Sequence, residues 1–335
     1  MVNKSLSIII PCRNEEMYIS ECINSFLKMD YPKELMEIIV VDGNSSDNTR
    51  NIVQEIQSGN SNILLIDNPD LYTPYALNLG IKNAKNDYVM IASAHSDFSK
   101  IYVSELMNAI DNFGADGVGG TITTDVRNKN KRTLSICKVL SNKFGVGNSI
   151  FRIGSDQPIR VDIVPFGIYK KDLLLEIGLY NERLIRNHDM ELSKRLISKE
   201  KKIYLIPTAK CRYYAREKFF GIFKNNFGNG YWVPLTIYIT KHLNSLSLRH
   251  FTPLIFILSL ILPVLLMFWL PVLGVISLIS LFSYFIIVIV QSARLKDNLT
   301  SFGYIFLAFL TLHFSYGMGS LSGLFRINYL FNNNR

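Results

Sequence analysis

Residues Tyr88–Phe98 read YVMIASAHSDF, and this stretch is the best guide to the fold of the chain. The apolar run Tyr88–Ala92 has the length and composition of a buried strand. Small and polar residues follow it, from Ser93 to Asp97. Because ligands of open parallel sheets bind beyond the carboxyl ends of strands, this cluster lies where chemistry can occur. A strand followed by a solvated turn is the alternative, and the flanking segments decide between the two.

Short apolar runs alternate with helical periodicity before this stretch. Strands are expected at Leu6–Ile10, Glu37–Val41 and Asn62–Ile66, and each is followed by a helical pattern. This alternation predicts a mostly parallel, doubly wound α/β sheet. The chain contains neither GxGxxG nor a GxxxxGK sequence followed by Ser or Thr. A dinucleotide-binding Rossmann domain and a P-loop are therefore disfavoured.

The second half of the soluble region is less regular. Gly145–Arg152 and Asp162–Tyr169 are expected to be loops around short strands, with short helices at Asp172–Ile177 and Asp189–Ser198. Residues 216–232 combine phenylalanines with lysines and asparagines ahead of a long apolar region. This pattern favours an amphipathic helix lying on a membrane surface, and an ordinary packed helix is the alternative.

The C-terminal region has the composition of a membrane anchor. Residues 251–290 contain no Asp, Glu, Lys or Arg. Stretches at about 251–270, 272–290 and 301–324 are each long enough to cross a hydrocarbon core of about 30 Å. We therefore expect a soluble domain at 1–215, an interfacial segment at 216–250, a transmembrane region at 251–325 and a tail at 326–335.

Charge and cysteine content indicate the compartment. The N-terminus has no apolar stretch long enough for a signal peptide, so we expect a multi-pass protein of the plasma (inner) membrane with its soluble domain in the cytoplasm. The net charge of +9 suits an anionic membrane surface better than nucleic acid, for which no motif is present. Four scattered cysteines without a CxxC pair fit a reducing compartment and disfavour a zinc site.

Five motifs occur in a fixed order along the chain: SIIIPCRNEE, EIIVVDGNSSDNT, YALNLGIKNAKNDYVMI, SAHSDF and PFGIYKKDLLLEIGLYNERLIRNHDMELSKRL. Together they resemble family 2 glycosyltransferases, over about residues 5–232. The likeness is greatest to the succinoglycan-type exopolysaccharide glycosyltransferases. The resemblance implies the GT-A fold, an α/β doubly wound mixed sheet.

The resemblance also implies a nucleotide pocket. Its lining would be formed by residues after the first strand, namely Pro11, Arg13, Asn14 and Glu15. Asp42 would hydrogen-bond the uracil or ribose, with Ser45 in the same loop. A carboxylate at the end of a strand can accept such hydrogen bonds, and it can equally cap the following helix. For Asp47, in the same loop, capping is the favoured role.

The metal motif of the family, DxD, aligns with Ser93-Ala94-His95. A serine therefore replaces the first carboxylate, at a position near the ribose of the nucleotide-sugar. His95 takes the place of the direct metal ligand, and Asp97 can compensate for the missing carboxylate. A neutral imidazole suits Mn²⁺ better than Mg²⁺, so a divalent metal is expected, with Mn²⁺ preferred.

The resemblance assigns Asp189 as the general base that removes the proton of the acceptor hydroxyl. The alternative for Asp189 is a carboxylate favoured by the helix dipole. Acceptor-side positions would be Phe166, Gly167, Glu191 and Arg195. A glycine lets a sugar approach the backbone closely. Glu191 could orient Arg195 or the acceptor, and a place on a solvated helix face is the favoured alternative.

These inferences predict an inverting transferase. It would move a hexose from a UDP-sugar to a polyprenyl-diphosphate-linked oligosaccharide in surface or exopolysaccharide biosynthesis, with other polysaccharide assembly enzymes as candidate partners. Three alternatives stay open: a processive polysaccharide synthase, a polyprenyl-phosphate sugar transferase, and a non-catalytic scaffold subunit of an assembly complex. The serine at position 93 motivates the last of these.

Overall fold

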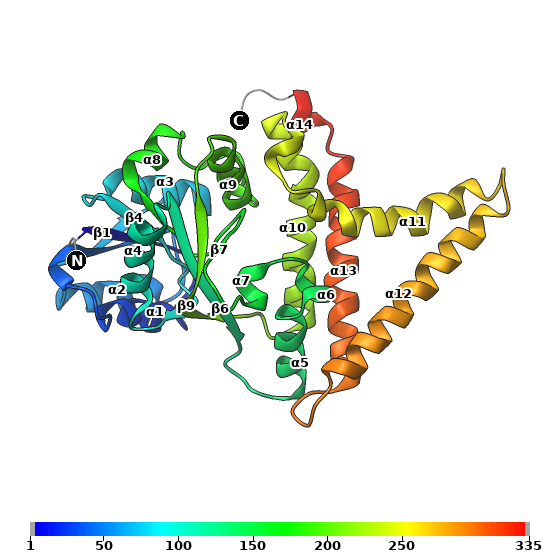
Figure 1. The fold of residues 1–335 in the computed structure, drawn as a ribbon, viewed down its shortest axis with the longest axis horizontal. Coiled ribbons are helices and arrows are strands. Elements are labelled where there is room, and N and C mark those ends of the chain that lie inside the picture. The colour runs from blue at the N-terminus through cyan, green and yellow to red at the C-terminus, as the bar shows by residue number, and fades with distance from the viewer. Residues whose placement is uncertain (1–3, 332–335) are drawn as a thin grey trace. The chain divides into compact units, whose positions relative to one another are not determined.

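The computed structural model describes residues 4–331, and their contacts divide the chain into two compact units, shown in Figure 1. The α/β unit combines the residues up to Thr123 with Ile150–Tyr214. The helical unit combines Thr124–Ser149 with the residues from Ala215 onward. The structure thus groups Thr124–Ser149 with the C-terminal helices, whereas the sequence analysis placed this segment in the soluble domain at 1–215.

A nine-stranded mixed sheet forms the centre of the α/β unit, in the order β3-β2-β1-β4-β8-β6-β9-β5 with β7 paired to β9. The strands are β1 Leu6–Cys12, β2 Met36–Asp42, β3 Ile63–Asp67, β4 Tyr88–Ile91, β5 Ser96–Phe98, β6 Gly117–Asp125, β7 Ile159–Arg160, β8 Ile168–Lys170 and β9 Ile203–Tyr214. The first four strands pair in parallel, as predicted. From β8 onward, antiparallel pairs follow, so the sheet is mixed rather than mostly parallel.

Helices cover both faces of this sheet. Alternate strand residues face opposite sides, and in the central strands both sets are apolar and need to be buried. Ile8 and Ile10 pack with one group of helices, and Ile9 between them packs with the other. The first group comprises α1 Ile19–Leu27, α2 Thr49–Ser58 and α4 Tyr102–Phe113. The second comprises α3 Thr73–Asn83, α8 Lys171–Glu176 and α9 His188–Ser198. Because β1 to β4 run in parallel, their carboxyl ends lie at one edge of the sheet.

The segment expected as loops around strands at Gly145–Arg152 contains short helical turns instead, α6 Lys143–Val146 and α7 Ile150–Ile153. Phe151 in α7 packs against the hydrophobic clusters on both faces of the sheet. That anchoring fixes the backbone of the next residue, Arg152.

The helical unit contains the apolar helices. Its elements are α5 Lys131–Leu140, α6, α10 Phe219–Thr240, α11 Thr252–Leu266, α12 Leu273–Leu295, α13 Phe302–Leu324 and α14 Asn328–Phe331, with 3₁₀ turns at Leu243–Ser245 and Leu248–Phe251. Three helical segments of the described chain are long and apolar enough to cross a membrane, which are Leu248–Leu266, Leu273–Leu295 and Phe302–Leu324. They correspond to the three stretches expected from composition.

Close contact between α10 and α13 depends on glycine. A Cβ atom at Gly230 would lie 2.0 Å from the carbonyl oxygen of Tyr316, and one at Gly319 would lie 2.1 Å from that of Phe227. The same holds for Gly323, whose Cβ would lie 2.3 Å from the carbonyl of Tyr231. The two helices therefore lie side by side with their backbones nearly touching, as small residues allow (Figure 1).

Candidate active site

A cavity of about 450 Å³ lies within the α/β unit, beyond the ends of β1 and β4. Residues from every expected group line it. The expected site residues among its lining are Pro11, Arg13, Glu15, Ser93, His95, Phe166, Gly167 and Asp189. The structure therefore brings the nucleotide, metal, acceptor and base positions to one place. Asn14, Asp42, Ser45, Asp97, Glu191 and Arg195 are not among the lining residues.

Asp42 ends β2 with its carboxylate turned into the protein. The residue is 1% exposed, and one carboxylate oxygen accepts hydrogen bonds from the Ser45 N–H at 3.1 Å and from the Arg50 guanidinium at 2.9 Å. The other oxygen accepts the Ser45 hydroxyl. Contact with uracil or ribose stays a prediction, and it would need Ser45 or Arg50 to release this carboxylate.

Asn14 and Asp47 hold the loop after β2 in shape. The N–H of Asn14 donates to the Ser45 hydroxyl at 2.9 Å, and its side-chain oxygen accepts from the Ser46 N–H at 2.8 Å. Asp47 accepts from the Thr49 N–H at 3.0 Å at the start of α2, from the position before the N-cap residue Asn48. Asn14 adopts a left-handed φ of 57°, which asparagine tolerates better than most residues.

The end of β4 presents Ser93 and His95 to the cavity. The Ser93 hydroxyl lies 3.5 Å from both ring nitrogens of His95, and His95 Nδ1 lies 3.2 Å from the Glu15 carboxylate. Burial disfavours the imidazolium, but the hydrogen bond to Glu15 and the electrostatic influence of Tyr213 outweigh it and raise the pKa of His95 to about 9. In the ligand-free protein, this pair therefore holds a proton at neutral pH.

The described residues contain no group of three or more His, Cys, Asp and Glu side chains able to hold a metal ion. His95 and Glu15 are neighbours in the cavity, but Asp97 pairs with the Arg212 guanidinium at 3.6 Å. His95 and Glu15 would hold a divalent ion here only if a bound substrate supplied further ligands.

Asp189 lies in the first turn of α9 and is exposed at the cavity. One carboxylate oxygen accepts the Met190 N–H at 2.9 Å. The neighbouring His188 also lines the cavity, and its Nδ1 has no hydrogen-bond partner among the described residues. Burial lowers the pKa of His188, against the opposing charge of Asp189, so its ring is neutral. The first turn of α9 thus offers an accessible carboxylate beside a neutral hydrogen-bonding ring.

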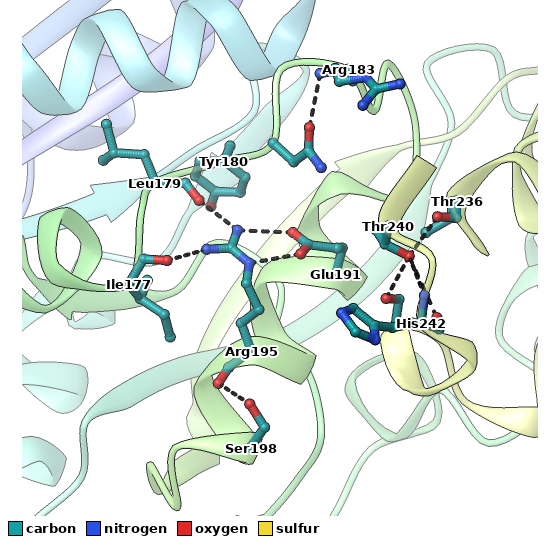
Figure 2. A network of polar contacts seen from close by, with 12 residues as sticks. Ile177, Leu179, Tyr180, Arg183, Glu191, Arg195, Ser198, Thr236, Thr240 and His242 are labelled. Carbon is teal, nitrogen blue, oxygen red and sulfur yellow. Dashed lines mark hydrogen bonds and ion pairs between the residues drawn. The ribbon is translucent and has the colours of Figure 1, made fainter. Parts of the chain in front are cut away.

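Glu191 and Arg195 form an ion pair on α9 (Figure 2). Arg195 donates to both carboxylate oxygens, at 2.7 and 2.8 Å, and its other donors reach the carbonyls of Ile177 and Leu179. Glu191 is only 6% exposed, so the expected solvated position was wrong, because the carboxylate orients Arg195 instead. The pair ties the loop after α8 to α9, and acceptor binding by either residue stays a prediction.

Phe166 and Gly167 form part of the cavity wall before β8. Phe166 has a left-handed φ of 47°, which is rare for a bulky residue and marks a strained position at the site. A Cβ at Gly167 would lie 2.8 Å from the Tyr169 ring. The glycine therefore makes room for a buried tyrosine of the protein itself.

Arg152 and Tyr213 are cavity residues that the sequence analysis did not identify. The Arg152 guanidinium lies over the Tyr213 ring, 5.1 Å from its centroid, and the His95 ring meets the same tyrosine at 4.8 Å. Burial lowers the pKa of Arg152, but an arginine remains protonated at neutral pH. The aromatic ring thus places a second cation beside His95. A lone arginine in an irregular segment carries no periodicity that could have revealed it.

Comparison with known sequences identifies the family. The model of Glycosyl transferase family 2 matches residues 7–178. A dolichyl N-acetyl-α-D-glucosaminyl phosphate 3-β-D-2,3-diacetamido-2,3-dideoxy-β-D-glucuronosyltransferase from Methanococcus voltae is 31% identical, over 78% of this chain and 83% of its own length. The succinoglycan biosynthesis protein ExoA of Rhizobium meliloti is 25% identical, over 69% of each chain.

Solved structures share the fold. Staphylococcus aureus TarS 1–349 in complex with UDP-GlcNAc superposes with a TM-score of 0.50 at 19% identity, covering 68% of this chain and 66% of that one. GalNAc-T7 with UDP, GalNAc and Mn²⁺ superposes with a TM-score of 0.52 at 15% identity, covering 65% and 45%. These likenesses show the GT-A architecture alone. From the family match and the Methanococcus voltae relative, the chain belongs to glycosyltransferase family 2.

Proposed function

We propose that this glycosyltransferase moves one hexose from a UDP-sugar to a polyprenyl-diphosphate-linked oligosaccharide, with inversion at the sugar C1. The observation that carries the proposal is that Asp189, His95 and Arg152 line one cavity. These three side chains supply a carboxylate able to accept a proton, an imidazole able to bind a metal, and a cation suited to a diphosphate.

The reaction is a single displacement. The acceptor hydroxyl gives its proton to the Asp189 carboxylate as its oxygen forms a bond to C1 of the sugar. The bond from C1 to the β-phosphate oxygen breaks, and the electron pair leaves with the nucleoside diphosphate. Arg152 stabilises the charge that develops on this leaving group. No covalent intermediate with the protein is needed.

A divalent metal, Mn²⁺ rather than Mg²⁺, is part of the proposal. GalNAc-T7, which shares the fold, was solved with UDP and Mn²⁺. When bound with the donor, such an ion supplies Lewis-acid stabilisation of the diphosphate. His95 would be its ligand from this chain, after giving up its proton, and Glu15 lies close enough to orient the ring.

The lipid-linked acceptor is proposed from two observations. The Methanococcus voltae relative is named for transfer to a dolichyl-linked N-acetylglucosaminyl phosphate. The helical unit of this chain carries helices suited to a membrane, where such a lipid resides. A cytoplasmic catalytic unit at the plasma membrane and a role in surface or exopolysaccharide synthesis complete the proposal, the latter supported by the likeness to ExoA.

Product analysis tests this function. Purified full-length protein is incubated with a panel of nucleotide sugars, Mn²⁺ and a membrane lipid extract, and labelled products are identified by mass. One hexose added to a lipid-linked saccharide is the expected result. Long polymer from UDP-sugar alone would favour a processive synthase, and hexose on polyprenyl phosphate a different transferase. Nucleotide binding without turnover on any acceptor would favour a scaffold subunit.

A further inference from the structure

The middle of α13 is bonded to a polar segment from a distant part of the chain. His313, at the centre of the helix, has Nε2 2.9 Å from the carbonyl oxygen of Phe144. Phe144 lies in α6, and Phe144 and His313 also meet as rings at 4.9 Å. The segment around Phe144 contains polar residues, of which Lys143 and Asn148 are exposed.

This contact is incompatible with α13 crossing a bilayer. If the helix spanned the membrane, His313 would lie near the midplane and would bring the α6 segment with it. The exposed Lys143 would then sit in hydrocarbon, where a charged side chain is costly. Irregular backbone exposed to lipid at that depth would be penalised further, because its polar groups would lack partners.

Both ends of the α11–α12 hairpin also contact α13. At the start of α11, Pro253 packs on Gly317, whose Cβ would lie 2.5 Å from the Pro253 carbonyl, and His250 lies 3.5 Å from the Tyr316 hydroxyl. After α12, the start of α13 is bonded to α5, because the Ser301 N–H donates to the Ser135 hydroxyl at 3.1 Å.

The polar residues beside these contacts mark the membrane surface. Arg249 precedes α11 and donates to the Asn148 carbonyl at 3.4 Å, and Asp297 follows α12 and pairs with Lys138 of α5 at 2.9 Å. The stretch of α13 between its two contact points, 301 and 317, is about 24 Å long. A helix perpendicular to the bilayer would carry residue 317, with Arg249 near it, through most of the membrane and away from the Asp297–Lys138 pair.

We infer that α13 lies along the membrane surface with α10, α5 and α6, and that only the α11–α12 hairpin enters the bilayer. Length and composition would allow α13 to span the bilayer, but its contacts with the polar segments hold it at the membrane surface. The hairpin offers lipid an apolar exterior, since only 11% of each of its apolar segments is buried, against 44% for α13. The partner of this layer of helices is therefore a lipid surface, and the basic residues Lys138 of α5, Lys143 of α6 and Arg249 before α11 suit anionic headgroups.

The location of the two termini tests this topology without reference to the reaction. Full-length protein carries different epitopes at its N- and C-termini, and sealed inverted membrane vesicles are treated with protease. A hairpin enters and leaves on one side, so both epitopes are expected to be digested together. Three spans would place the termini on opposite sides, and protection of one epitope until detergent is added would overturn the inference.

The depth of α13 gives a second test that needs no epitope. Leu307 and Met318 are exposed and, being eleven residues apart, lie on the same face of the helix. Each is replaced by tryptophan after Trp232 and Trp269 are changed to phenylalanine, and quenching by lipids brominated at different depths is measured. A surface helix predicts the same depth for Leu307→Trp and Met318→Trp. A difference approaching their separation of about 16 Å along the axis would contradict it.

Discussion

Two polar loops follow parallel strands on either side of β1, and they use their side chains in opposite ways. After β2, the Asp42 carboxylate is buried and bonded to Ser45 and Arg50. After β4, Ser93 and His95 face the cavity. The helix α9 repeats this contrast within one turn, because Asp189 is exposed at the cavity whereas Glu191 is buried in an ion pair. Polar residues after strands, or in the first turn of a helix, thus either hold the fold or face the cavity.

The largest expected effect distinguishes the two carboxylates of α9. Asp189→Asn removes the proposed base and should lower turnover by about 100- to 10,000-fold, the usual contribution of general base catalysis. UDP binding should be nearly unchanged. Turnover is measured as hexose transferred to lipid. Asp172→Asn is the matched control, because Asp172 is also an exposed carboxylate in the first turn of a helix, outside the cavity. Wild-type activity in Asp189→Asn would refute the assignment.

A smaller loss of activity is expected at Arg152. Arg152→Gln should lower kcat/KM by about 100-fold, since a donor to a developing anion is removed. Affinity for UDP should fall, whereas affinity for uridine, which lacks phosphate, should not. Isothermal titration calorimetry measures both. Arg160→Gln serves as the control, because Arg160 is an exposed arginine of the same unit that does not line the cavity. Equal losses for UDP and uridine would indicate a structural role instead.

Glu191 should affect stability rather than chemistry. Glu191→Gln leaves the partly buried Arg195 guanidinium with a weaker partner, and we expect the free energy of unfolding to fall by about 2 kcal/mol. Activity per folded molecule should persist. Thermal unfolding in detergent and transfer assays measure the two effects, with exposed Glu176→Gln as control. Loss of acceptor affinity at unchanged stability would restore the acceptor role implied by the family resemblance.

The smallest effect concerns pH. The pKa of His95 is raised from 6.5 to about 9 in the folded protein, so its pairing with Glu15 stabilises the fold fully below pH 6.5 and is lost as the pH rises toward 9. The melting temperature in metal-free buffer should therefore fall by a few degrees across this window. Glu15→Gln should remove most of this dependence. The same slope in wild type and variant would show that other groups cause it.

The sequence predicted the first half of the fold well because local patterns determine it. Residues such as Ile8, Ile9 and Ile10 are apolar on both faces, as buried parallel strands require, and the intervening helices have clear periodicity. The antiparallel half was harder to predict, since β5 and β8 are three residues long and are defined by partners far away in sequence.

The candidate site was predictable in location but not in the state of each side chain. Strand ends and family motifs pointed to Ser93, His95 and Asp189, which the cavity brings together. Nothing local distinguishes a carboxylate that will be bonded to Arg50, as Asp42 is, from one that faces a ligand. Arg152 depends on the packing of Phe151 between two cores, a tertiary property without a sequence pattern.

The most direct test of the account compares Asp189→Asn and Arg152→Gln in one experiment. Turnover with the lipid acceptor and affinity for UDP are measured for both variants and for the wild type. The account predicts that Asp189→Asn loses turnover but binds UDP normally, whereas Arg152→Gln loses both. If Asp189→Asn transferred sugar at the wild-type rate, or if both variants bound UDP as tightly as the wild type, the assignment of base and leaving-group cation in this cavity would be contradicted.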